Sequence, residues 1–433
     1  MNYFKKTFKS NFAKSVLIVT SGTALAQILS LSLSPIITRM YTPEEYGFLT
    51  AFSAILGLLT IVGSFKYELG IAIAEDDEKA INVLALCLIV LLAFVGIVTV
   101  ILILFGKYFL SLFNGETLID YILLVPIGIL FVGLYNIFMQ WGFRKKDFKS
   151  ISITKLSQSL FSNFIKIGLG LFSLGPIGLI LGNIIGTSSG LTTLSMPLIR
   201  KERDLVKKIN IKGIIWSAKR YIGFPMLSAP SQFFNAAGIQ LPILFITSLY
   251  GTHVIGFYGL ANGVVNMPMV LLGKSVSDVF YGEAASIGRT NPERLKDLSI
   301  KLIKKLILIG VFPFIILLLF SPYLFSFVFG TNWYEAGVFA RIIALLVFLR
   351  FVFTPISRVY SVFERQKEAL FLDVLRVILV LIVFLIAKVA SLSSYWAVGL
   401  YTIVMSIIYL LTFILALKII NEEIAKKVEE YKN

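Results

Sequence analysis

Residues 221–273 read YIGFPMLSAPSQFFNAAGIQLPILFITSLYGTHVIGFYGLANGVVNMPMVLLG and contain no Lys, Arg, Asp or Glu. A helix that spans a membrane needs about 20 predominantly apolar residues. This stretch is therefore too long for one crossing of a bilayer, and its length suits two crossings joined by a turn. It predicts the class of the fold, because a chain with such a segment is expected to lie in a membrane.

The composition of the whole chain agrees with a membrane protein. Hydrophobic residues make up 57% and charged residues 15% of the 433 residues. In a bilayer the backbone must satisfy its own hydrogen bonds, so that spans are helices or closed barrels. A barrel would alternate apolar and polar residues in runs of about ten, whereas 80–105, 306–334 and 389–417 are continuously apolar or uncharged. We expect an all-α polytopic membrane protein.

Twelve helical spans are predicted, and their connectors differ sharply in charge. Most of the 40 Lys and Arg residues fall in the connectors on one side, and only Arg39, Lys107 and Lys388 in those on the other. Cytoplasmic connectors carry the excess of Lys and Arg, so both termini are expected in the cytoplasm. The net charge of +16 is then an orientation signal and a contact with anionic lipids, and no nucleic-acid partner is expected. The approximate spans are 15–38, 46–73, 80–105, 119–143, 150–172, 175–199, 215–248, 254–281, 299–321, 336–358, 366–388 and 394–418.

The two halves of the chain repeat one another. EYGF at 45–48 opens the second span much as VIGF at 254–257 opens the eighth, and the outer corners at 105–115 and 320–330 share their spacing of Phe, Tyr, Ser and Gly. Six helices per half is an even number, so both halves enter the membrane in the same direction. The predicted parts are an interfacial cytoplasmic tail (1–14), an N-lobe (15–199), a cytoplasmic inter-lobe loop (200–214), a C-lobe (215–418) and a cytoplasmic C-terminal tail (419–433).

Such lobes facing each other would leave a cleft, which is the architecture of a transporter. Cys87 and His253 are the only residues of their types, so an intrachain disulfide, a metal cluster and a His-based catalytic set are excluded. The longest segment outside the membrane is only about twenty residues, which leaves no room for a catalytic domain. No cofactor is predicted, and a proton or a sodium ion could each serve as coupling ion.

Basic residues inside the spans supply the candidate binding site. Lys166 and Arg350 lie nearest the middle of their spans, and Lys155 and Arg341 lie about a turn from an end, where their side chains could snorkel. A charge at membrane depth costs about 2.5–3.5 kcal/mol and needs a partner or a function. Because Arg offers a phosphate two parallel hydrogen bonds and Lys adds a point charge, these residues predict an anionic guest.

Acidic residues in the spans have basic neighbours. Lys274 and Asp278 are four residues apart, and Asp373 and Arg376 are three apart, so each pair can neutralise itself on one helix face. The pairs either belong to the cleft, with the carboxylates as coupling groups, or are local structural pairs, and the spacing leaves both alternatives open. The predicted substrate-binding set is Lys155, Lys166, Lys274, Arg341, Arg350 and Arg376.

Helix breakers mark the first span of each half. Span seven holds Pro225, Pro230 and Pro242, and span one holds Gly22 and Pro35. Irregular backbone at membrane depth is tolerated where it lines a cavity or bends during gating. A static kink packed against its neighbours explains any single proline as well, but breakers in both halves favour bending.

Two motifs resemble a known family. The connector TRMYTPEEYG at 38–47 is similar to that of the bacterial polysaccharide flippases of the Wzx type, in the superfamily of the multidrug and toxic compound extruders and the lipid II flippase. The corner FGTNW at 329–333 also resembles that family. The resemblance implies a V of two six-helix lobes with alternating access, a cationic cleft to which Lys166 and Arg350 would contribute, and an undecaprenyl-pyrophosphate-linked oligosaccharide as substrate. It also implies the bacterial inner membrane as location, and polysaccharide polymerase and chain-length proteins as partners.

Three other functions are alternatives to this one. A multidrug extruder would move organic cations and favour unpaired carboxylates at depth, whereas a lipid II flippase shares the anionic lipid guest. A membrane glycosyltransferase or polymerase would need a sizeable outer loop or an acidic catalytic cluster, and the short outer turns provide neither. The residues thus predict a transporter of an anionic guest without enzymatic activity, and the resemblance implies a flippase that carries the lipid-linked oligosaccharide from the inner to the outer leaflet for O-antigen or capsule assembly.

Overall fold

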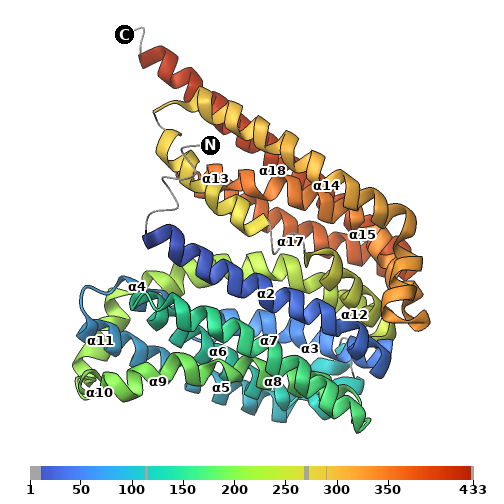
Figure 1. The fold of residues 1–433 in the computed structure, drawn as a ribbon, viewed down its shortest axis with the longest axis horizontal. Helices are drawn as coiled ribbons and strands as arrows, with labels where there is room; N and C mark the ends of the chain where they lie inside the picture. Colours follow the sequence, from blue (N-terminus) through green and yellow to red (C-terminus); the bar gives the residue numbers. More distant parts are fainter. Residues whose placement is uncertain (1–10, 113–115, 268–272, 289, 431–433) are drawn as a thin grey trace. The chain divides into compact units, whose positions relative to one another are not determined.

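The computed structural model describes residues 11–112, 116–267, 273–288 and 290–430 (Figure 1). This part of the chain is helical and contains no strand, which confirms the predicted all-α class. The elements are α2 (Asn11–Met40), α3 (Pro43–Val62), α4 (Leu69–Ile73), α5 (Asp77–Leu112), η1 (Glu116–Tyr121), α6 (Leu124–Arg144), α7 (Phe148–Leu171), α8 (Pro176–Ser189), α9 (Leu191–Lys201), α10 (Arg203–Val206), α11 (Ile211–Arg220), η2 (Phe224–Ser228), α12 (Ala229–Val265), α13 (Lys274–Ile287), α14 (Pro292–Phe329), η4 (Thr331–Trp333), α15 (Tyr334–Phe353), η5 (Thr354–Ser357), α16 (Arg358–Val362), α17 (Gln366–Val389) and α18 (Ser394–Glu430).

Within the described ranges, ten helical segments are long and apolar enough to cross a membrane. They correspond to all of the predicted spans except the fifth and the eighth. The fifth is α7, whose three lysines and row of Ser, Gln and Asn side chains lower its hydropathy. The eighth is divided between the end of α12 and α13. The predicted polytopic membrane fold is confirmed.

Two predicted spans are shorter than the sequence suggested. The span 46–73 ends as a helix at Val62, and Phe65 and Lys66 then adopt positive φ before the short α4. The span predicted to start at 215 is two elements, because α11 ends at Arg220 and a π-helical turn (η2) precedes α12. Gly251, with φ 81° and ψ 176°, interrupts α12 in the predicted gap between spans seven and eight.

The chain forms two compact units, Met1–Gly256 (unit 1) and Phe257–Asn433 (unit 2). In unit 1, α2 packs along α7 and α7 packs along α8. In unit 2, α14 packs on α15, and both contact α18, which runs beside α14 (Figure 1). The lobe boundary predicted at 200–214 concerns the sequence repeat and stays a prediction.

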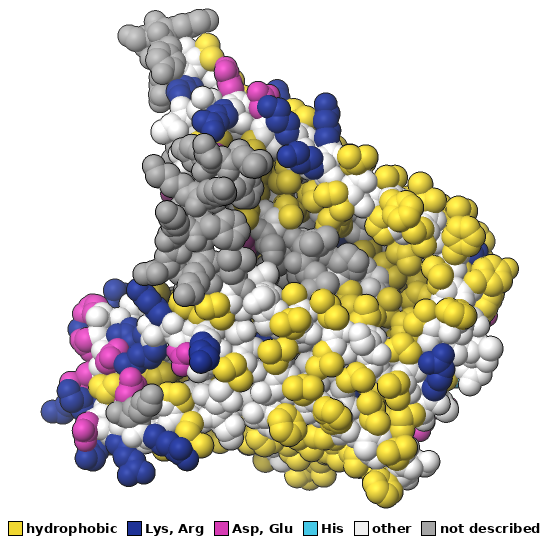
Figure 2. All heavy atoms as spheres, in the orientation of Figure 1, with side chains coloured by type: hydrophobic (Ala, Val, Ile, Leu, Met, Phe, Trp, Pro, Cys, Tyr) yellow, Lys and Arg dark blue, Asp and Glu magenta, His cyan; other side chains and the backbone are white. Residues whose placement is uncertain are grey.

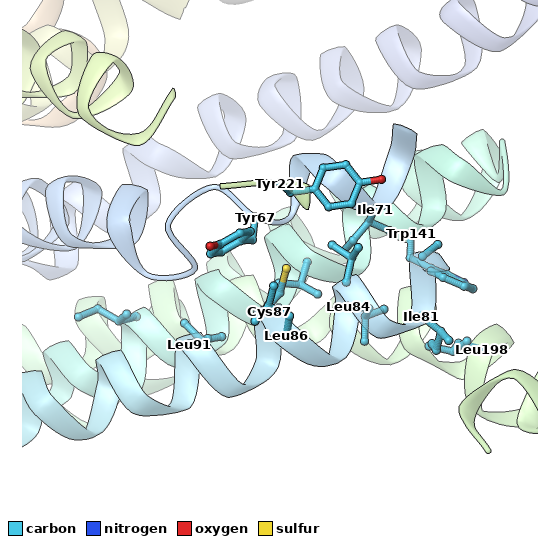
Figure 3. Close-up of a cluster of buried hydrophobic side chains, with 14 of the residues drawn as sticks. Tyr67, Ile71, Ile81, Leu84, Leu86, Cys87, Leu91, Trp141, Leu198 and Tyr221 are labelled. Atoms are coloured by element: carbon cyan, nitrogen blue, oxygen red, sulfur yellow. The ribbon is translucent and has the colours of Figure 1, made fainter. Parts of the chain in front are cut away.

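The core of unit 1 lies among α4, α5 and α6 (Figure 3). Cys87 and Leu91 of α5 and Ile129 of α6 are fully buried in it. Gly133 lets the helices approach, because a Cβ there would lie 2.4 Å from a methyl group of Leu91. Since lipid tails are as apolar as these side chains, close van der Waals packing holds such a core together in a bilayer.

The connector at 38–47 is a helix start. Thr42 caps α3 by accepting a hydrogen bond from the Glu45 amide, while the Glu45 carboxylate accepts one from the Thr42 amide at 2.7 Å. Pro43 occupies the first turn, where its missing N–H is not needed. The TPEE sequence is thus a capping box that fixes where α3 begins.

The two repeated motifs contact each other. A Cβ on Gly47 would lie 1.8 Å from the carbonyl oxygen of Thr252, and one on Gly256 would lie 1.7 Å from that of Pro43. The Thr252 hydroxyl also donates to the Glu44 carboxylate at 3.3 Å. The first turn of α3 and residues 251–256 therefore meet backbone to backbone, which only glycine at these two positions allows.

The internal repeat is visible in the backbone. Lys146 and Glu364 have φ of 54° and 57°, and Ser173 and Ser391 have φ of 52° and 48°. Positive φ is uncommon outside glycine, and both pairs have the same separation, 218 residues (146 to 364 and 173 to 391). These turns flank α7 and α17, which have 24 residues each. The fifth helix of the first half therefore corresponds to the fifth helix of the second.

Charged and apolar side chains occupy different parts of the surface. In unit 1, Lys, Arg, Asp and Glu gather at the end that carries α10 and α11, and hydrophobic side chains cover the flank (Figure 2). On α5, Ile89, Leu92 and Ile97 are more than half exposed. Large apolar side chains exposed in such number are expected of helices that face lipid.

Candidate functional site

Unit 1 contains a polar cavity of about 260 Å³ between α2, α7 and α8. Each helix contributes small or amide-bearing side chains at helical spacing, so that one polar face of each points to the same space. The side chains that define it are Gln27 and Ser30 on α2, Lys155, Gln158 and Ser162 on α7, and Asn183 on α8.

Hydrogen bonds between helices fix the walls of this cavity. Ser159 donates to the backbone carbonyl of Ala26 at 2.8 Å and lies 2.8 Å from the hydroxyl of Ser30. The amide of Gln158 donates to the carbonyl of Thr187 at 3.1 Å. Because these polar groups already have partners, the cavity is preorganised rather than collapsed around unsatisfied atoms.

Lys155 and Lys166, two of the three lysines of α7, have different surroundings. Lys155 lines the cavity, and its ammonium lies 4.9 Å from the centre of the Tyr135 ring, a cation–π contact. Lys166 lies one turn beyond Ser162, and its aliphatic stem packs where Gly182 leaves room. Among the described residues, the half-buried Lys166 ammonium has neither a hydrogen bond nor an ion pair.

A second polar cluster lies in unit 2 around Arg350. Its guanidinium donates to the side-chain oxygen of Asn266 at 3.5 Å, and the Asn266 amide donates to Asn262 at 2.7 Å. Tyr258 and Tyr401 are buried beside it, and the charge of Arg350 acts on both hydroxyl groups. Residues 258, 262 and 266 are spaced by four, so α12 and the turn that follows it present them on one face.

Arg376 extends this cluster. It forms the ion pair with Asp373 that the sequence spacing predicted, at 3.1 Å, and lies 5.6 Å from the ring of Tyr409. The charges of Arg376 and Arg350 both act on Tyr401. The Nε of Arg376 and the hydroxyls of Thr402 and Ser406 are buried without a partner in the described part of the chain. Buried polar groups without a hydrogen-bond partner in the protein are usually satisfied by a ligand or a water molecule.

The other predicted site residues lie apart from these two clusters. Asp278 pairs with Arg358 at 3.4 Å, and both side chains are about half exposed. Arg341 donates to the backbone carbonyl of Leu319 at 3.2 Å and is tied to α14. Lys274 begins α13, but its side chain lies outside the described ones.

The predicted helix breakers have distinct local roles. Gly22 allows a close contact of α2 and α7, because a Cβ there would lie 2.0 Å from the Ser152 hydroxyl. Pro35 lies inside the continuous α2, and Pro242 lies inside α12. Pro225 lies in the π-helical turn η2, and Pro230 is the second residue of α12, which follows this turn. Their part in bending stays a prediction.

The 218-residue separation relates some polar residues of the two clusters. Lys155 and Gln158 on α7 correspond to Asp373 and Arg376 on α17 (155 to 373 and 158 to 376), and Asn183 on α8 corresponds to Tyr401 (183 to 401). Each repeat therefore carries polar side chains at the same place, with different charges. Tyr258, Asn262, Asn266 and Asn183 were not among the predicted site residues, although polar residues at four-residue spacing in apolar spans indicate a polar helix face.

A network of ion pairs links the start of α5 to the ends of α6 and α9. Arg144 and Lys145 pair with Asp77 at 2.8 and 2.7 Å, and Lys145 also pairs with Glu202 at 2.8 Å. Burial disfavours the charge of Lys145, but its hydrogen bonds to Asp77 and Glu202 outweigh this and raise the pKa of Lys145. This network joins three helices and touches neither cluster.

The helical fold of the chain is similar to that of several solved transporters. An inward-facing multidrug resistance transporter of the MATE family has a TM-score of 0.69 with 15% identity over 94% of this chain and 95% of its own. Lipid II flippase MurJ in an inward closed conformation has a TM-score of 0.69 with 15% identity over 93% and 87%. A transporter from Pyrococcus furiosus, described by a reverse polarity of its binding pocket, has a TM-score of 0.65 with 15% identity over 95% and 96%.

The family follows from the sequence itself. A model of the polysaccharide biosynthesis protein family matches residues 36–338, and the chain belongs to this family. No curated protein matches the chain. The structural neighbours are under 25% identical, so they establish the fold of the chain, and the family assignment adds its connection to polysaccharide synthesis.

Proposed function

We propose that the chain is a flippase that moves an undecaprenyl-pyrophosphate-linked oligosaccharide from the inner to the outer leaflet of the bacterial cytoplasmic membrane, for O-antigen or capsule assembly. The observation that carries the proposal is Lys166, a cation at membrane depth whose ammonium has no bonding partner among the described residues. Such a charge needs water or an anionic guest. A diphosphate supplies the missing partner.

The cluster in unit 2 supports the same guest. Arg350 and Arg376 act on the same tyrosine, and the buried Nε of Arg376 has no partner in the described part of the chain. A guanidinium can bind a phosphate through two parallel hydrogen bonds. The phenol and amide groups of Tyr258 and Asn262 beside it suit sugar hydroxyls.

The charge balance disfavours an organic cation as guest. The acids within or next to the spans have basic partners: Glu68 pairs with Lys66 at 3.5 Å, Asp278 with Arg358, and Asp373 with Arg376. A multidrug extruder would need a carboxylate available at depth to compensate its cationic guest. The lipid II flippase has a similar fold and an anionic lipid guest, so that activity is the second candidate, and the sugar attached to the diphosphate distinguishes the two.

The membrane potential assists this direction of transport. Moving one elementary charge across 100 mV is worth about 2.3 kcal/mol, and an inside-negative potential drives an anion outward. In the proposed mechanism the sugar head crosses along the polar faces while the lipid tail stays in the bilayer. Both termini are then cytoplasmic, a proton or sodium ion can add to the drive, and polymerase and chain-length proteins act on the product outside.

The test is export in a strain whose surface polysaccharide depends on this chain. Lys166→Gln combined with Arg350→Gln should abolish surface polysaccharide and leave the protein inserted, as measured by its amount in the membrane fraction. Lys149→Gln is the matched control, because Lys149 is exposed at the start of the same helix. Unchanged polysaccharide in the double variant contradicts the proposal. Loss of cell-wall precursor export, with surface polysaccharide unaffected by deletion of the chain, favours the lipid II activity.

A further inference from the structure

Unit 2 contains a separate, apolar crevice of about 100 Å³ between α14, α15 and the end of α12. Apolar cavities of this order stay dry and bind small hydrocarbons, as an engineered cavity of about 150 Å³ binds benzene. Its walls include Ile309, Gly310, Phe314 and Leu317 of α14, Phe348 of α15, and Val265 of α12.

The walls of the crevice are fixed by aromatic rings. Phe314 and Phe348 stack with ring centres 5.1 Å apart and planes 24° from parallel. Gly310 makes room for these rings, because a Cβ there would lie 3.0 Å from Phe348 and 3.2 Å from Phe351. Because its sides are rigid and flat, the crevice cannot change its shape to fit different lipid chains.

The inner end of the crevice adjoins the arginine cluster. Val265 precedes Asn266, whose side chain accepts the hydrogen bond from Arg350. On α15, Val347 lies one turn before Arg350 and Phe351 directly follows it, and both line the crevice. One stretch of helix therefore presents a guanidinium and an apolar slot side by side.

The other end of the crevice opens on the apolar surface of α14. Ile309 is 55% exposed and Phe312, in the next turn, is 70% exposed. Lys304 and Lys305 lie about one turn before Ile309, and a lysine band of this kind marks the cytoplasmic interface. The crevice therefore lies at the depth of the inner-leaflet acyl chains.

We propose that this crevice binds the first isoprene units of the polyprenyl chain of the substrate, with its diphosphate at Arg350. The inference rests on the proposed function and adds the place where the lipid tail is recognised. A polyprenyl chain fits better than an ordinary acyl chain because its alkene units are flat and rigid. Such units lose less conformational freedom on entering a fixed slot.

The probe for this site is a polyprenyl diphosphate that carries a photoreactive group in its first isoprene units. The full-length protein is labelled in nanodiscs of phosphatidylethanolamine and phosphatidylglycerol, and the labelled peptides are identified by mass spectrometry. We expect label in 309–317 or 344–351. Leu317→Trp fills the slot and should lower the labelling about tenfold, the loss expected when about two methylene groups fewer are buried. Leu318→Trp is the control, because Leu318 is on the exposed face of the same turn.

Three outcomes overturn the proposal: label that maps outside these peptides, equal labelling of the Leu317→Trp and Leu318→Trp variants, or equal labelling of these peptides by a phosphatidylglycerol that carries the same photoreactive group in its acyl chain. The last would identify the crevice as an ordinary acyl-chain site. If surface polysaccharide export still depends on Lys166 and Arg350, any of these outcomes contradicts only the proposed lipid-tail site. If export is unchanged when Lys166 and Arg350 are replaced, the proposed function itself is contradicted.

Discussion

Replacement of Lys166 by Met should make the empty protein more stable and the transporter inactive. Met keeps the length of the aliphatic stem that packs at Gly182, and it removes the ammonium that has no partner in the described part of the chain. Insertion scales assign about 2.5–3.5 kcal/mol to a Lys at the centre of a span. Because the side chain is only half-buried, we expect a smaller gain of about 1–2 kcal/mol.

The assay compares thermal unfolding of the purified variants in one detergent, with and without a polyprenyl diphosphate. Ligand at a hundred times its dissociation constant stabilises the native state by about 2.7 kcal/mol. The wild type should gain this increment and the Met variant should lose most of it. Lys149→Met, at the exposed start of α7, should change neither value. A Met variant that is less stable than the wild type when empty, or equally stabilised by the ligand, would refute the reasoning.

Three further predictions concern other parts of the molecule. Arg350→Lys keeps the charge but loses the planar fork, so transport should fall by about tenfold, the effect of about 1.4 kcal/mol, while membrane insertion is retained; equal transport rates would show that the fork is not used. Gly256→Ala places a Cβ 1.7 Å from the carbonyl oxygen of Pro43 and should lower the unfolding temperature. Gly263→Ala, with open space around its Cβ, should leave the unfolding temperature unchanged or raise it. Equal unfolding temperatures of the two variants would argue against the backbone contact. Because the pKa of Lys145 is raised, its ion pairs stabilise the protein below the ordinary pKa of 10.5, and this stabilisation is lost as pH rises through the raised value. Lys145→Gln should therefore be less stable than the wild type at neutral pH, and the difference in stability should close only in strong alkali. A difference that closes near pH 8 contradicts the network.

The fold was largely predictable because a bilayer imposes simple constraints on sequence. Long uncharged stretches predicted most of the spans, and 150–172 was also predicted as a span although the lysines of α7 lower its hydropathy. The turn at 63–68 was missed because positive φ at Phe65 and Lys66 leaves no compositional trace. The separation of α11 from α12 was missed because Gly223 and Pro225 lie within an otherwise apolar run.

The site was predictable only where the contacts are local. The Asp373–Arg376 pair follows from spacing on one helix and is present. The partner of Asp278 that the structure gives, Arg358, lies 80 residues further along the chain. Likewise, the hydrogen bond from Arg350 to Asn266 links α15 to the end of α12, and local periodicity carries no information about such contacts.

The central claim is that membrane-depth cations hold a diphosphate while it crosses. The most direct measurement places the full-length protein in proteoliposomes with a fluorescent undecaprenyl-pyrophosphate oligosaccharide and follows the sugar becoming accessible to an impermeant glycosidase. The wild type should flip the lipid, faster when the membrane potential drives anions in that direction, and the Lys166→Gln, Arg350→Gln double variant should not. Equal rates for the two proteins, or faster movement of an organic cation than of the lipid, would contradict the account.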